Sequence, residues 1–246
     1  MLKGGVMNII DILIILFVGF QLFQGFRRGF IKTLFDTIGI IAAFFLSKLF
    51  CFYAENFLLN NTKLYVKTYD FIAKHSEGFK EILKGNSNDI VTAFREALHL
   101  PIELQTVLSN IFNYSTSANV DAYKLFIDNM TMMLIRSLSF IITFLIFYVI
   151  LLVLSNVINT LFKLPGLNIT NRMFGALGGA VKSLIVLYII FALCSPVIGF
   201  AQNNKIAKEV IESESSKIFY ENNIILNYLS YKNFYGNYSN INNYIN

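Results

Sequence analysis

Four apolar runs, each close to or above the roughly twenty residues that span a bilayer, limit what this chain can fold into. They occupy Met7–Phe23, Phe30–Tyr53, Met133–Phe162 and Met173–Ala201. The whole chain of 246 residues is 55% hydrophobic and 14% charged, against about 45–50% apolar and 25% charged in a soluble domain. The sequence therefore predicts an all-α, polytopic integral membrane protein with four transmembrane helices in two hairpins and an amphipathic helical insertion.

These runs divide the chain into four predicted parts. Residues 1–53 form a first transmembrane hairpin and residues 133–201 a second, because a short turn joins the two runs of each pair. Residues 54–132 have mixed charge and the apolar spacing of short amphipathic helices outside the membrane. Residues 202–246 form a polar tail that is rich in Asn and Tyr.

Local signals refine the two polar parts. One amphipathic helix is predicted after a cap at Asn88, and another restarts at Pro101, a residue suited to a first helical turn. From Asp121 an amphipathic pattern runs without a breaker into the third apolar run, which predicts one long helix that projects beyond the bilayer. In the tail we expect a weak helix over Ile218–Leu229 and disorder elsewhere.

Small residues recur about every four positions in the predicted membrane helices. Residues four apart share a helix face, and small side chains let two backbones approach closely in lipid. We therefore predict helix packing through these positions. The set is Gly25, Gly29, Gly39, Ala43, Gly175, Gly179 and Ser183.

Charges inside the apolar runs are costly unless they find partners. Asp36 and Lys182 lie at similar depths from the two short turns, and each belongs to a face of small residues. We predict that packing of Gly39 and Ala43 against the small face around Lys182 joins the two charges as an ion pair. Lys32, one helical turn before Asp36, is the competing partner.

The remaining charges near the membrane have simpler interpretations. Arg27 and Arg28 in the first turn would anchor it to lipid headgroups, and Asp11, near a helix end, would reach interfacial water; a functional role stays open for each. Both short turns, Gln24–Gly29 and Lys163–Arg172, hold basic residues and no acid. This predicts that the turns are cytoplasmic and that residues 53–132 and both termini lie outside.

Two motifs in this order resemble the colicin V production protein (CvpA) family of bacterial membrane proteins. Asn8-Ile9-Ile10-Asp11 opens the first run, which ends in Gly25-Phe26-Arg27-Arg28-Gly29-Phe30. The second motif is Gly166-Leu167-Asn168, Asn171-Arg172, Gly175, Gly179, Lys182 and Ser183. Asn171 stands where the family has an acid, Ser183 where it has its last glycine and Thr33 where an acid is common. The family-motif polar residues are Asp11, Arg28 and Arg172.

The resemblance implies a multi-pass protein of the bacterial cytoplasmic (inner) membrane, associated with production or export of the bacteriocin colicin V and with the cell envelope. One hypothesis is a helical scaffold or accessory protein, whose partners besides the lipid bilayer are other membrane proteins or copies of itself. The alternative is a small oligomeric channel or secondary transporter, whose polar helix faces line a path.

Catalytic chemistry is not expected from this sequence. It contains no HExxH, GxSxG or CxxC motif and no phosphate-binding loop, and His75 and His99 lack metal-ligand partners at helical spacing. We therefore expect no catalytic residues, no metal, no cofactor and no enzymatic activity. The net charge is only +5, and the basic residues are scattered along the chain with no interleaved aromatic platform. This argues against nucleic-acid binding.

Overall fold

The computed structural model describes residues 7–76, 101–109, 121–162, 168–200, 205–231 and 234–235. Every regular element within these ranges is an α-helix, which confirms the predicted all-α class. The labelled helices are α1 (Ile9–Arg28), α2 (Phe30–Asn61), α3 (Leu64–His75), α7 (Ala122–Phe162), α8 (Ile169–Phe200), α9 (Lys205–Glu212), α10 (Glu214–Tyr220) and α11 (Ile224–Tyr231). A further helix covers residues 102–109, directly after Pro101 as predicted, whereas the helix predicted after Asn88 lies outside the described residues.

Within the described ranges, four helices are long and apolar enough to cross a membrane. The spans are Ile9–Arg28, Phe30–Asn61, Tyr123–Val157 and Ile169–Gly199, in α1, α2, α7 and α8. Each overlaps one of the four apolar runs, and the predicted polytopic membrane protein is confirmed. The boundaries that we predicted at residues 53 and 132 fall inside the continuous helices α2 and α7.

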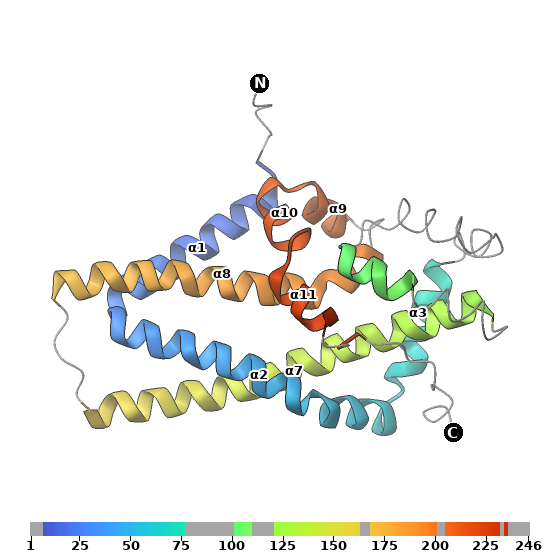
Figure 1. The fold of residues 1–246 in the computed structure, drawn as a ribbon, viewed down its shortest axis with the longest axis horizontal. Helices are drawn as coiled ribbons and strands as arrows, with labels where there is room; N and C mark the ends of the chain where they lie inside the picture. The colour runs from blue at the N-terminus through green and yellow to red at the C-terminus, as the bar shows by residue number, and fades with distance from the viewer. Residues whose placement is uncertain are drawn as a thin grey trace.

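The four membrane helices pair crosswise between the two hairpins. α1 packs along α8, α2 packs along α7, and α2 also contacts α8 and so joins the two pairs. By contrast, α1 and α2 diverge from Gly29, whose positive φ of 79° favours glycine and allows the sharp turn (Figure 1). The last residues of α1 and α7 and the first residues of α2 and α8 lie at one end, on the left of Figure 1. We call it the turn end.

At the other end of the molecule, α7 is longer than a single membrane crossing requires. α7 has 41 residues, which at 1.5 Å per residue is about 60 Å, twice the thickness of a hydrocarbon core. It runs without a break from Ala122 into the third apolar run, so the single long helix that the pattern from Asp121 predicted is present, and α3 packs beside it. The Tyr65 hydroxyl donates to Asp128 Oδ1 at 2.7 Å across this contact. Leu104 and Leu108 of the helix over 102–109 are buried here.

The described part of the C-terminal tail is folded, so our prediction of disorder is wrong for residues 205–217, 230–231 and 234–235. α9, α10 and α11 form there and pack on α8 and α1. The weak helix predicted over Ile218–Leu229 is interrupted, because α10 ends at Tyr220 and α11 begins at Ile224. Each of the three helices buries two apolar residues: Ala207, Val210, Phe219, Tyr220, Leu226 and Leu229.

The end of the described tail fills the space between α2, α7 and α8. Arg136 of α7 makes two hydrogen bonds to the buried Glu55 carboxylate of α2, at 2.7 and 2.8 Å, and donates a third to the Phe234 carbonyl at 2.9 Å. The Tyr235 hydroxyl lies 3.1 Å from Ser137 Oγ. Burial raises the pKa of Tyr235 above its ordinary value. The tail is therefore part of the hydrophobic core.

Candidate functional site

Glycines make the closest helix contact, where α1 crosses α8 near the turn end. A Cβ added to Gly25 would clash with the carbonyl group of Gly175, whose carbon atom would lie 2.9 Å away. A Cβ on Gly175 would lie 2.7 Å from the carbonyl carbon of Gly29, and one on Gly179 would lie 3.0 Å from that of Gln21. The structure thus brings four of the predicted packing residues together at one crossing, where only glycine fits without moving a helix.

Gly39 is not part of this crossing and does not meet Gly179 as we predicted. The neighbour of a Cβ on Gly39 would be Leu151 of α7 at 4.0 Å, an ordinary contact. Ala43 and Ser183 are fully buried, and Ser183 donates to the Ala180 carbonyl at 2.6 Å. The reason is that the glycines of α8 meet matching glycines on α1, which permits a closer approach than the Gly39 face of α2.

Three charges nevertheless meet at the turn end, and we call them the charge chain. Lys182 Nζ of α8 lies 3.9 Å from Asp36 Oδ2 of α2. Arg28 Nη1 of α1 is closer to that oxygen, at 2.7 Å. The side chains of Lys182 and Asp36 are only 7% and 9% exposed. Lys32, the predicted competitor, makes no ion pair with Asp36 in the part of the chain that the structure describes.

Arg28 is the member of the charge chain that we missed from the sequence. We assigned it to lipid headgroups because it lies in a short basic turn, yet it reaches past the turn to Asp36. The sharp conformation at Gly29 makes this reach possible, since it brings the end of α1 against the first turns of α2. The charge chain has two positive charges and one negative charge, so the net charge of these three residues is +1.

A cavity of about 330 Å³ adjoins Lys182. Its lining comes from all four membrane helices: Phe17, Gln21, Ile40, Ile141, Phe144, Leu145, Tyr148, Lys182, Val186, Ile189, Ile190, Leu193 and Cys194. The buried Oε1 of Gln21 has no hydrogen-bond partner among the described residues. Leu145 and Ile190 are about half exposed, at 53% and 46%, so the cavity opens toward the lipid-facing surface. A buried cation beside a mostly apolar cavity suits a group that carries negative charge.

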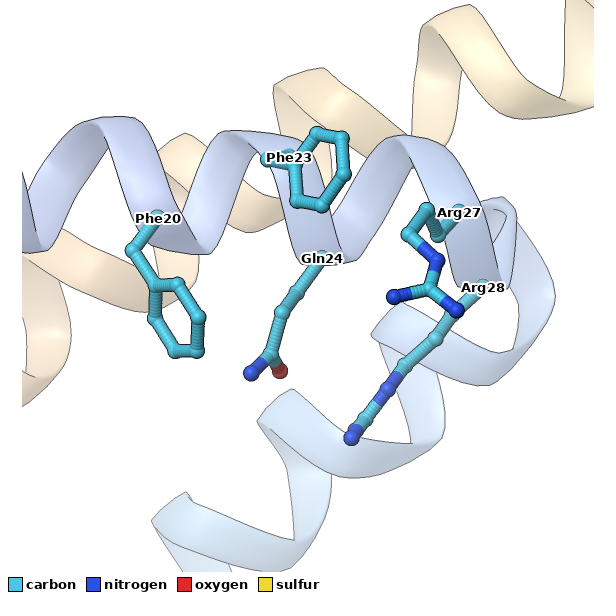
Figure 2. A pocket seen from close by; sticks show the side chains of 5 residues that line it. All are labelled: Phe20, Phe23, Gln24, Arg27 and Arg28. Carbon is cyan, nitrogen blue, oxygen red and sulfur yellow. The ribbon is translucent and has the colours of Figure 1, made fainter.

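A second hollow, of about 360 Å³, lies on the surface of α1 near the turn end. It is lined by Phe20, Phe23, Gln24, Arg27 and Arg28, and we call it the arginine hollow. Figure 2 shows these side chains on α1, with Arg28 extending toward α2.

The polar residues at the start of α8 have different roles from those of α1. Arg172 is exposed and lies outside both cavity linings. Asn171 Oδ1 accepts the Phe30 N–H at 3.0 Å. Gly29 gives α2 no side-chain cap, so this amide satisfies a free N–H at the start of α2. Asn171 therefore has a structural role in joining the start of α8 to the start of α2.

Asp11 joins the start of α1 to the tail. We expected it to reach interfacial water, but it is buried. It is 6% exposed. Its Oδ1 accepts the Ser213 hydroxyl at 2.7 Å and the Ser215 N–H at 2.9 Å, and its Oδ2 accepts the Asn8 N–H at 3.1 Å. The Asn8 amide donates to the Glu209 carbonyl at 2.6 Å. The cluster of serines at 213–216 was the available signal in the sequence.

Asp11→Asn should loosen the tail. The new amide would present N–H groups to the Asn8 N–H and would lose the charge that strengthens three hydrogen bonds, a cost of about 1.5–3 kcal/mol. We expect faster tryptic cleavage at Lys205, Lys208 and Lys217, followed by gel electrophoresis. Asp70→Asn, which changes an exposed carboxylate on α3, should cleave like the parent. Unchanged cleavage of the Asp11 variant would show that Asp11 does not hold the tail.

No group of three or more His, Cys, Asp or Glu side chains suited to a metal ion occurs in the described residues. His75 is exposed on α3, and its ring nitrogen lies 2.8 Å from the Phe71 carbonyl. His99 lies outside the described ranges.

Comparison with known proteins identifies the family. The family model described as colicin V production protein matches residues 10–82 and 93–222. No curated protein and no solved structure matches the chain. The match includes Asp11, the glycine crossing, all three members of the charge chain and most of the folded tail. This chain therefore belongs to the colicin V production protein family.

Proposed function

We propose that this protein is a helical scaffold or accessory protein of the bacterial cytoplasmic membrane, which serves bacteriocin (colicin V) production and export or maintenance of the cell envelope. In this role it acts without enzymatic activity, through contacts with other membrane proteins or with further copies of itself. Membership of the family supports the link to colicin V production.

The crosswise pairing of the membrane helices carries this proposal. A transporter built from two hairpins would alternate access by rocking one hairpin against the other. Here such a motion would break both long interfaces at once, since α1 packs along α8 and α2 along α7. The glycine crossing, the charge chain and the Asp11 contacts add further links between the hairpins and the tail. An interlocked unit suits a protein that holds partners in place.

A transport function has one specific observation in its favour. The cavity beside Lys182 contains a buried cation and the unpartnered Gln21 Oε1, and a transporter or oligomeric channel would use such groups to bind a solute. This second candidate predicts that the charges themselves, and not only the fold, are needed for activity.

Deletion of the gene in the source bacterium, followed by resupply of variants, separates these functions. The scaffold predicts that deletion lowers bacteriocin activity in the medium or raises sensitivity to detergents, and that the double variant Asp36→Asn, Lys182→Met restores the parental level. Liposomes that carry the pure protein should show no ion or dye flux above protein-free liposomes. Flux that disappears in the double variant, together with failure of that variant in cells, would favour the transporter.

A further inference from the structure

The arginine hollow combines cationic, amide and aromatic side chains on one part of α1. Gln24, Arg27 and Arg28 provide N–H donors near the end of the membrane span, and Phe20 and Phe23 lie one to two turns deeper along the helix (Figure 2). The two phenylalanine residues are 55% and 58% exposed. The hollow thus has a polar part at the turn end and an apolar part toward the middle of the bilayer.

The two arginines differ in how their charges are used. Arg28 is bound to Asp36 through Nη1, and Asp36 also faces Lys182. Arg27 has no acidic partner among the described residues, and its guanidinium carbon lies 5.8 Å from the centre of the Phe23 ring. The hollow therefore has a positive charge left to bind an anion, and the Phe23 ring restricts where that charge lies.

We propose that the arginine hollow binds one anionic phospholipid, with its phosphate at Arg27, Arg28 and Gln24 and its acyl chain over Phe20 and Phe23. Guanidinium groups pair with phosphate through two parallel hydrogen bonds. The end of a membrane span lies at the depth of the lipid headgroups. The apolar part of the hollow lies within the membrane span, so the acyl chain of a bound phospholipid can cover the two aromatic rings, whereas a soluble phosphate would contact only the polar part.

Two matched variants distinguish a specific lipid-binding site from general electrostatic attraction between the protein and anionic lipid. Pure protein in a nonionic detergent is titrated with phosphatidylglycerol, and bound lipid is counted by native mass spectrometry. Arg27→Gln and Arg172→Gln each remove one exposed arginine at the turn end, but only Arg27 lines the hollow. If only general electrostatic attraction held the lipid, the loss of one positive charge would weaken binding about fivefold in both variants. The lipid site predicts a further loss of about tenfold for Arg27→Gln alone, from the lost phosphate contacts.

Two further measurements identify the ligand. Phosphatidylcholine, which has no net charge, should bind more weakly than phosphatidylglycerol, and glycerol phosphate at equal concentration should not displace the lipid. Both variants should keep the parental melting temperature in lipid-free detergent, since neither arginine is buried. Equal losses in the two variants, equal affinity for phosphatidylcholine, or displacement by glycerol phosphate would each overturn the proposal.

Discussion

Gly25→Ala should destabilise the protein by about 2–3 kcal/mol, the upper part of the range for overpacked interiors. The added methyl group would meet the backbone of Gly175, which no rotamer change can move away. α1 and α8 would have to separate along their whole contact, and Gly175 and Gly179 would lose their close neighbours as well. Helix propensity alone would predict the opposite result, because alanine is the better helix former by about 1 kcal/mol.

Gly19→Ala is the matched control on the same helix, because a Cβ there has nothing within 4 Å. It should leave stability unchanged or raise it by up to about 1 kcal/mol. Thermal unfolding in detergent, monitored by aggregation or by loss of circular dichroism, compares the two variants directly. If Gly25→Ala were as stable as Gly19→Ala, the close crossing of α1 and α8 would not exist in the folded protein.

Asp36→Asn should destabilise the protein by about 3 kcal/mol, as expected when one partner of a buried ion pair is removed. Arg28 is 39% exposed and can turn to water or headgroups. Lys182 is 7% exposed and has no such route. The cost therefore comes mainly from a lysine left without a counter-charge inside the membrane span.

Removal of the stranded lysine should reverse most of this loss. Asp36→Asn with Lys182→Met replaces the buried cation by an unbranched apolar side chain, so stability should return toward the parental value. Arg28→Gln alone should cost less than Asp36→Asn, because Asp36 keeps Lys182 as a partner. A double-mutant cycle on chemical unfolding measures the coupling. Additive effects at positions 36 and 182 would mean that the two charges do not interact.

The sequence predicted the membrane helices well because length and apolarity alone decide whether a segment can span a bilayer. It also identified Gly25, Gly29, Gly175 and Gly179, since glycines four apart mark a close helix contact. It did not identify their partners. Periodicity shows which face of a helix packs but not against which helix, and the Gly39 face was a plausible match for Gly179 until the structure placed Leu151 there.

The charge chain and the tail show two other reasons why prediction fails. Asp36 and Lys182 could be matched by depth, whereas the role of Arg28 depends on a turn conformation at Gly29 that residue types alone do not fix. In the tail, frequent Asn and Tyr suggest a disordered chain, but Leu226 and Leu229 are fully buried. Few such apolar residues are needed to fold the tail, because the membrane helices supply the rest of the core. Composition is a poor guide for a segment that packs on an existing surface.

The contacts of Asp11 also bear on how the chain is made. Asn8 and Asp11 hydrogen-bond to residues 201 and 202 positions later in the chain. During synthesis α1 reaches the membrane first, yet the groups that bind its first turn are translated only after α8. Insertion of α1 and its final packing are consequently separate events, because contacts between distant parts of a chain form late and slowly. Until α10 emerges from the ribosome, the Asp11 carboxylate has to be satisfied by water or by the protein-translocation machinery.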